Sequence, residues 1–212
     1  MKKNIVQACI ATVSFPATLE ALYRMLDKHG SYETDMDSLL YENDEISEIW
    51  WTAAKWLVKG DILFFYHTKS ALQRIKSLLK KVDKQHNPDI WNILKEAEEA
   101  AIMYGGTIFG YGIVQSLPEN RSSEPELHHF KGRIFAPIDY IHIFEKPLNT
   151  ANFTKFISIG QSTITSLDKK SFDGIHQLLI AENDVPEYFR LAIFSEIGFH
   201  NISKNNWLQA ST

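Results

Sequence analysis

The chain has 212 residues, of which 44% are hydrophobic and 12% aromatic, and its formal net charge is −4. This composition is typical of a folded globular protein with one substantial core, and it excludes a disordered tail. The negative net charge argues against a protein whose affinity comes mainly from neutralising phosphates.

The charge is nevertheless unevenly distributed along the chain. Residues 55–84 carry eight basic and two acidic side chains, a local charge of +6, so the remainder carries about −10. The basic residues of this window are Lys55, Lys59, Lys69, Arg74, Lys76, Lys80, Lys81 and Lys84. The negative net charge of the whole chain therefore conceals a local basic patch.

The cysteine content and the hydropathy pattern are typical of a cytoplasmic protein. Cys9 is the only cysteine, which excludes an internal disulfide and a zinc site built from several cysteines. Two lysines precede an apolar run near the N-terminus, but Asn4, Gln7 and Thr12 interrupt that run, so it favours a strand over a signal peptide. No run approaches the roughly 18 apolar residues of a membrane span. We expect a cytoplasmic protein that does not contact a membrane.

The first third of the chain contains two clear elements. Residues 4–13 are rich in β-branched side chains and predict a buried strand. Leucines at helical spacing predict a helix over 18–29 that ends at Gly30. Residues 31–47 are acidic and show no strong period, which indicates a loop with at most one short helix.

The middle of the chain predicts a strand and two helices. After a turn at Lys59-Gly60-Asp61, residues 62–67 form a strongly β-prone run. Residues 70–84 have an apolar face and a basic face, as in an amphipathic helix. Asn87 and Pro88 fit the cap and first position of a second helix that ends near residue 104.

The last half begins with a strand over 107–116 that contains Gly110 and Gly112, a pattern typical of a close backbone approach or a bend. A polar loop follows at 117–128. Further strands are expected within 130–144, broken at Ala136-Pro137, and within 157–167, and helices over 171–180 and from Pro186 to about Ile197. This order of elements predicts an α+β fold: a small mixed β-barrel of about five to six strands surrounded by helices.

Four segments occur in an order that belongs to a known family. They are Ile49-Trp50, residues 59–67, residues 106–114, and Phe130-Lys131-Gly132-Arg133-Ile134, and residues 162–167 follow them before a helix. In this order they resemble the EVE and YTH domains of the PUA-like superfamily. The resemblance covers roughly residues 4–180. It implies a PUA-like domain over 1–180 with a helical insertion at about 70–104, and residues 181–212 packed on it as a C-terminal helix and tail.

The family resemblance implies a pocket that reads one modified base, above all a methylated one, or a flipped base in RNA or DNA, with no catalytic machinery, cofactor or metal. Aromatic faces stack on an unstacked base, while polar groups read its edge. The implied base-binding residues are Trp50, Trp51, Tyr66, Phe130, Gln161 and Ser162, and the implied phosphate-binding residues are Arg133, Lys131, Lys69 and Arg74. Trp50 and Trp51 are adjacent and face opposite ways on a strand, so only one of them lines such a pocket, and the resemblance favours Trp50.

The chain departs from the YTH pattern at two places. His128, His129 and Phe130 stand where a second pocket tryptophan is usual, and Gly160-Gln161 replace an Arg-Asp pair. These departures change what the pocket accepts, so the base, its modification and the choice between DNA and RNA stay open. A bacterial restriction or defence setting rests on analogy with the family alone.

Other function classes have weaker sequence support. His128-His129 with Glu124 and Glu126 lack the spacing of a metal hydrolase site, and the chain has no G-x-S-x-G elbow, Walker loop or dinucleotide motif. A protein-interaction or scaffold module is the main alternative. The acidic balance and the additional helices would then form a docking surface for a partner effector protein.

Overall fold

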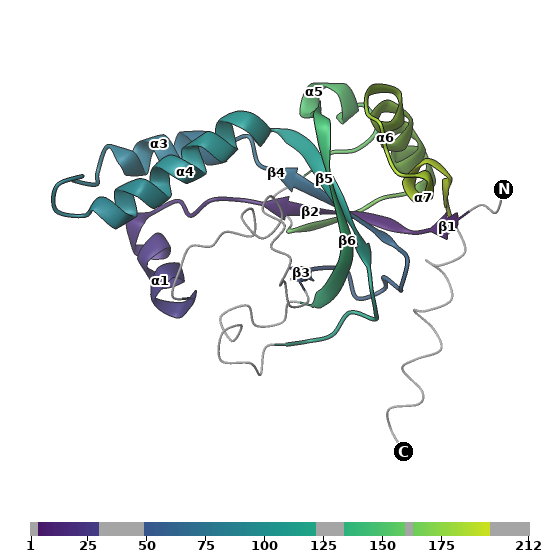
Figure 1. The fold of residues 1–212 in the computed structure, drawn as a ribbon, viewed down its shortest axis with the longest axis horizontal. Helices are drawn as coiled ribbons and strands as arrows, with labels where there is room; N and C mark the ends of the chain where they lie inside the picture. The colour runs from purple at the N-terminus through teal and green to yellow at the C-terminus, as the bar shows by residue number, and fades with distance from the viewer. Residues whose placement is uncertain (1–3, 30–48, 122–133, 160–162, 196–212) are drawn as a thin grey trace, which may run out of the picture.

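The computed structural model describes residues 4–29, 49–121, 134–159 and 163–195. Their main element is a six-stranded sheet that curls into a half-barrel, with the strand order β3-β6-β5-β4-β2-β7 (Figure 1). A separate parallel pair joins β1 to β8. The strands are β1 Asn4–Val6, β2 Ala8–Val13, β3 Ile49–Thr52, β4 Ile62–His67, β5 Thr107–Val114, β6 Phe135–Asn149, β7 Ile164–Ser166 and β8 Ala192–Phe194. The mixed α+β class expected from the sequence is confirmed at this level.

The curl of the sheet brings its two ends toward each other. Strands β2 and β4 are parallel, and the other neighbours in the main sheet are antiparallel. Three strands separate β3 from β2 in the order, yet the Cys9 thiol of β2 interacts with the backbone of Ala54, just beyond β3. Trp51 of β3 and Ala11 of β2 belong to one buried cluster. The inner face of the half-barrel is therefore filled with side chains.

Both faces of the sheet are covered because its central strands are apolar on both sides. In β4, Phe64 and Tyr66 belong to an outer cluster and Leu63 and Phe65 to the inner one, as the alternation of a strand requires. The outer cluster packs under α5 (Thr150–Phe153), α6 (Lys169–Glu182) and α7 (Glu187–Arg190), which lie together on one side in Figure 1.

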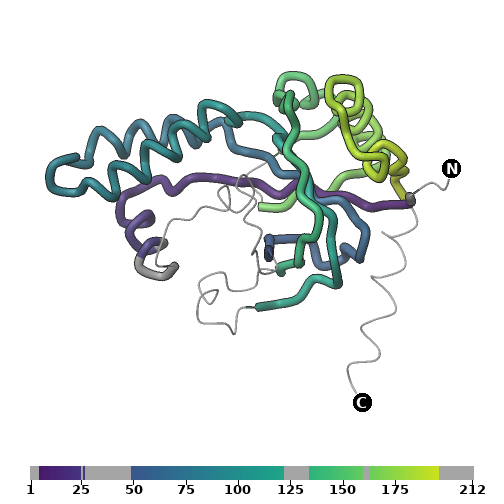
Figure 2. The backbone as a smooth tube through the Cα atoms, in the orientation of Figure 1, coloured from purple at the N-terminus to yellow at the C-terminus, as the bar shows by residue number. Residues whose placement is uncertain are grey.

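The remaining helices form a third unit beside the sheet. Helices α3 (Ala71–Leu79) and α4 (Pro88–Tyr104) make an antiparallel hairpin that extends from one end of the sheet, and α1 (Leu19–His29) lies beneath it (Figures 1 and 2). Their shared apolar side chains form a cluster of their own. Both helices expected between residues 70 and 104 are present, although α3 ends at Leu79 and not at residue 84. Along the described residues, no helix combines the length and apolar character that a membrane crossing requires.

Three local predictions were wrong. The first strand is divided at Gln7, whose backbone N–H donates to the Asp61 carboxylate at 2.8 Å instead of extending the ladder. Strand β6 is unbroken at Ala136-Pro137, where it pairs with β3. The helix expected from Pro186 to Ile197 is only α7, because the following residues form β8, which pairs with β1 and buries Ala192 and Phe194.

Candidate functional site

The two adjacent tryptophans of β3 have different surroundings. Trp51 is 6% exposed and packs inside the half-barrel, with its ring centroid 5.0 Å from that of Phe65. Trp50 is half-buried, and the guanidinium of Arg121 lies 4.1 Å above its ring. The alternation of side chains along a strand separates the two rings. Trp51 therefore belongs to the core, and Trp50 is the tryptophan of this pair that a ligand can approach.

The contact between Trp50 and Arg121 shows what this indole face accepts. A guanidinium is flat, cationic and weakly hydrated, so it stacks on an aromatic face much as a base does. Such a contact stabilises by roughly 0.5–1 kcal/mol at an exposed site and by about 2 kcal/mol when desolvated, and both side chains are half-buried here. Arg121 was not among the residues singled out from the sequence, because it comes from the loop after β5 and only the fold brings it to β3.

Tyr66 has a different position from Trp50. It is 7% exposed on the outer face of β4, and its ring makes an edge contact with Phe153 at 6.1 Å. Strands β6 and β5 lie between β3 and β4. The described structure thus places Tyr66 under α5 as a core residue and does not bring it together with Trp50.

The two described residues expected to bind phosphate lie at the start of α3. Lys69 is exposed, and its aliphatic stem lies close to Gly106. Arg74 donates from Nη1 to the backbone oxygen of Phe15 at 3.0 Å, which ties α3 to the segment between β2 and α1. Arg74 therefore has a structural contact of its own. The remaining expected site residues, Phe130, Lys131, Arg133, Gln161 and Ser162, lie outside the described residues.

Polar side chains gather at the carboxyl ends of β2 and β4. These strands are parallel, so their carboxyl ends meet at one edge, where Val13 pairs with His67. Three buried polar atoms there have no hydrogen-bond partner within the described ranges: Thr12 Oγ1, His67 Nδ1 and Thr68 Oγ1. A buried polar atom without a partner costs about 1–3 kcal/mol, so such a group is a good candidate for contacting a ligand.

His67 is held neutral by its surroundings. It is 4% exposed, and burial lowers the pKa of its imidazole from 6.5 to about 4. A neutral imidazole presents one donor and one acceptor nitrogen, which suits the edge of a base better than a phosphate. The sequence placed His67 only at the end of a strand. Its burial follows from the pairing of β4 with β2 and β5, which sequence spacing does not reveal.

Trp50 and His67 lie toward the same end of the sheet but on opposite faces of it. Trp51 and Phe65 belong to the inner cluster, so Trp50 faces outward on β3, whereas His67 faces inward on β4. Through the sheet order, β3 runs antiparallel to β2. Because the Cys9 thiol interacts with the Ala54 backbone, the chain traced back from Ala54 to Trp50 runs toward the carboxyl end of β2. Thr163, which accepts a hydrogen bond from the Thr12 N–H at 2.8 Å, lies at that same end. The described structure therefore does not bring His67 together with Trp50.

No three His, Cys, Asp or Glu side chains among the described residues come together in a way that would hold a metal ion. Comparisons of the chain with known protein families, with curated proteins and with solved structures found no match.

Proposed function

We propose that this chain is a non-catalytic nucleic-acid-binding module of the PUA-like, EVE/YTH type, which recognises a modified or flipped base. The observation that carries the proposal is the contact at Trp50, a half-buried indole with a flat cation 4.1 Å above its ring. It supports the proposal because an aromatic face that stacks a guanidinium also stacks a base. The ordered motif resemblance supplies the class of ligand.

In the proposed mechanism the base replaces the guanidinium of Arg121 on the Trp50 ring. Stacking contributes roughly 1–3 kcal/mol per base, and a methyl group on the base adds apolar contact with the indole. Arg121, once displaced, pairs with the phosphate beside the bound base, since a guanidinium binds phosphate through two parallel hydrogen bonds.

The residues outside the described ranges keep the roles that the resemblance gives them. Gln161 and Ser162 would add contacts to the edge of the base, and Phe130 would form a second aromatic wall. Lys131 and Arg133 would bind phosphates. No role in base binding is proposed for Trp51 or Tyr66, because the core packing of both rings occupies their faces.

The test is a binding panel of short DNA and RNA oligonucleotides, methylated and unmethylated, measured by fluorescence anisotropy at 50 and 200 mM salt. We expect the wild-type protein to prefer one modified oligonucleotide. Trp50→Ala should reduce that preference to near one, whereas Trp50→Phe, which keeps an aromatic face, should retain part of it. Equal, weak and salt-insensitive binding of all oligonucleotides by the wild-type protein would contradict the proposal and favour a protein-interaction module.

A further inference from the structure

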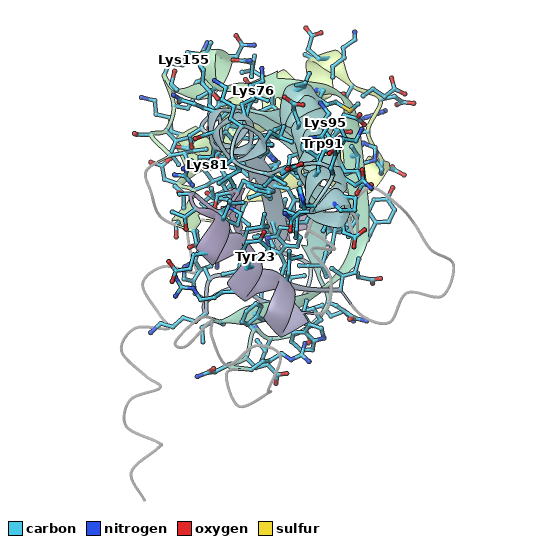
Figure 3. All side chains as sticks on the ribbon, turned by 90° about the vertical axis from the view of Figure 1, so that its left-hand side faces the viewer. Tyr23, Lys76, Lys81, Trp91, Lys95 and Lys155 are labelled. Atoms are coloured by element: carbon cyan, nitrogen blue, oxygen red, sulfur yellow. The ribbon has the colours of Figure 1, made fainter. Side chains whose placement is uncertain are left out.

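A groove lies on the outer surface of the α3–α4 hairpin, away from the half-barrel. Its volume is about 350 Å³, and Figure 3 views it from the hairpin end, with Lys76, Trp91 and Lys95 labelled. The residues that line it are Lys76, Leu79, Lys80, Trp91, Lys95 and Glu98. The groove is thus an apolar floor of one indole and one leucine, bordered mainly by lysines.

The packing of the hairpin explains why these side chains face outward. Helices α3 and α4 bury Ile75, Leu78 and Leu94 against each other and against α1. Lys76 and Lys80 are four residues apart, so they follow one another along the same exposed side of α3. Trp91 remains half-buried between this side and the surface of α4.

The charge of the groove is strongly positive. Lys84 lies with Nζ 4.1 Å from the centre of the Trp91 ring, and Lys95 Nζ lies 5.8 Å from it. Glu98, the acidic residue of the lining, pairs with Lys95. Among the described residues, neither Lys76 nor Lys80 has an ion-pair partner. The three lysines and one glutamate of the lining give a local charge of +2, and Lys84 over the Trp91 ring adds one more positive charge, in a chain whose net charge is −4.

A ligand for this groove has to be anionic and to contain a flat apolar part. The lysines select negative charge, and the Trp91 ring offers a stacking face to a base when the Lys84 ammonium above it moves to a phosphate. A single-stranded nucleic acid has both properties, because each base is attached to a phosphate-bearing backbone. An acidic peptide supplies the charge, but glutamate and aspartate have no ring to stack on the indole.

We propose that the α3–α4 groove is a second nucleic-acid site, in which one base of a single strand stacks on Trp91 while Lys76 and Lys80 bind the adjoining phosphates. The inference rests on the proposed function, because the groove would bind a further stretch of the same nucleic-acid strand that presents its modified base to Trp50. Its role is affinity for the strand, whereas the role of the Trp50 site is choice of the base.

The test compares a trinucleotide with a 15-nucleotide single strand, both fluorescently labelled, by anisotropy at several salt concentrations. Lys76→Gln/Lys80→Gln should weaken binding of the 15-mer at least tenfold and reduce the slope of log affinity against log salt by about 1.4, since each phosphate contact on a single strand contributes about 0.7. Trp91→Ala should weaken binding of the 15-mer by about five- to 150-fold.

The matched control is Lys169→Gln/Lys170→Gln, which removes the same charge from exposed lysines in the first turn of α6. We expect it to leave the affinity of the 15-mer within twofold of wild type. Thermal unfolding of each variant checks that the fold is retained. Equal losses in the control and groove variants would overturn the inference, because net charge alone would then explain them.

The two proposals fail in distinguishable ways. If only the groove is wrong, Lys76→Gln/Lys80→Gln leaves 15-mer binding unchanged, while the preference for a modified base persists and still depends on Trp50. If only base recognition is wrong, the 15-mer binds through the lysines with no preference for modified bases. Binding of a labelled glutamate-rich peptide that is lost in Lys76→Gln/Lys80→Gln, with no oligonucleotide binding, would overturn the inference in favour of a protein partner.

Discussion

His67 is a basic residue that the fold accepts only in its neutral form. Burial lowers its pKa from 6.5 to about 4, because the imidazolium would lose its hydration inside the protein. Between these two values the unfolded chain binds a proton at this residue and the folded chain does not. Protons therefore favour the unfolded state, and stability falls as the pH decreases through this range.

We predict that the free energy of unfolding decreases between pH 7.5 and pH 5, with about 2 kcal/mol of the loss coming from His67. Urea denaturation at a series of pH values measures it. His142 and His176 also have lowered pKa values through burial and contribute in the same direction. The contribution of His67 to the pH dependence of the free energy of unfolding is therefore the difference between the curves of the wild-type protein and of His67→Gln. Parallel pH curves for the two proteins would show that the folded state accommodates the charged ring.

At the scale of single elements, β5 and β6 approach each other unusually closely at two glycines. A Cβ atom at Gly110 would lie 2.6 Å from the backbone oxygen of His142, and one at Gly112 would lie 2.3 Å from Ile138 Cγ2. The pairing of the two strands shifts register beside both glycines. The sequence predicted a close approach or bend at this pair, and the structure confirms the close approach.

We predict that Gly110→Ala and Gly112→Ala each destabilise the protein by about 1–3 kcal/mol, the usual cost of inserting a methyl group into a well-packed region. Gly110→Ala should be the more damaging, because a backbone oxygen cannot move aside as a side-chain methyl can. Chemical denaturation measures both, with Ile113→Val as a nearby variant that introduces no clash. Stabilities within 0.5 kcal/mol of wild type for both glycine variants would mean that the strands are farther apart.

Elements with a strong local pattern could be predicted from the sequence, and contacts between distant segments could not. The β-prone run at Ile62–His67 and the cap residues before α4 gave bounds that agree with the structure. The division of the first strand at Gln7 depends on Asp61, 54 residues away. The short strand β8 likewise depends on β1 at the other end of the chain, so its residues have a helical pattern but not a helical structure.

The same distinction applies to the candidate site. Aromatic content and motif order pointed to Trp50, but its separation from Trp51 required the register of β3, and its contact with Arg121 required the fold. The side-chain oxygens of Thr12 and Thr68, which have no hydrogen-bond partner among the described residues, have no signal in the sequence, since threonine is common in strands. The groove at Trp91 arises only where two helices pack side by side.

At the scale of the whole molecule, the buried apolar side chains form three separate clusters, which draw on different parts of the chain. The outer cluster runs from Val6 to Phe194 and so ties together both ends of the described structure. The helical cluster is formed by α1, α3, α4 and their flanks and shares no residue with the other two. The last turn of α4 belongs to the half-barrel instead: Tyr104 is part of the inner cluster, where its ring lies 5.1 Å from that of Phe109. Cooperative units of a protein often follow such boundaries.

We predict that the α3–α4 hairpin unfolds locally while the sheet stays folded. A truncation in the core of the hairpin should then affect the hairpin alone, whereas one in the outer cluster should affect the whole sheet. Leu94→Ala should cost about 2–5 kcal/mol and reduce amide exchange protection in α3 and α4 while leaving β4 and β5 protected. Phe189→Ala should cost about 3–5 kcal/mol and reduce protection throughout the sheet, because the Phe189 ring stacks on Tyr111 at 4.4 Å and contacts Phe64 and Phe144. Hydrogen exchange with mass spectrometry, on both variants and the wild type, measures each segment. Equal loss of protection in α4 and β5 in the Leu94→Ala protein would instead show that hairpin and half-barrel unfold as one unit, and the groove at Trp91 would then be as rigid as the site at Trp50.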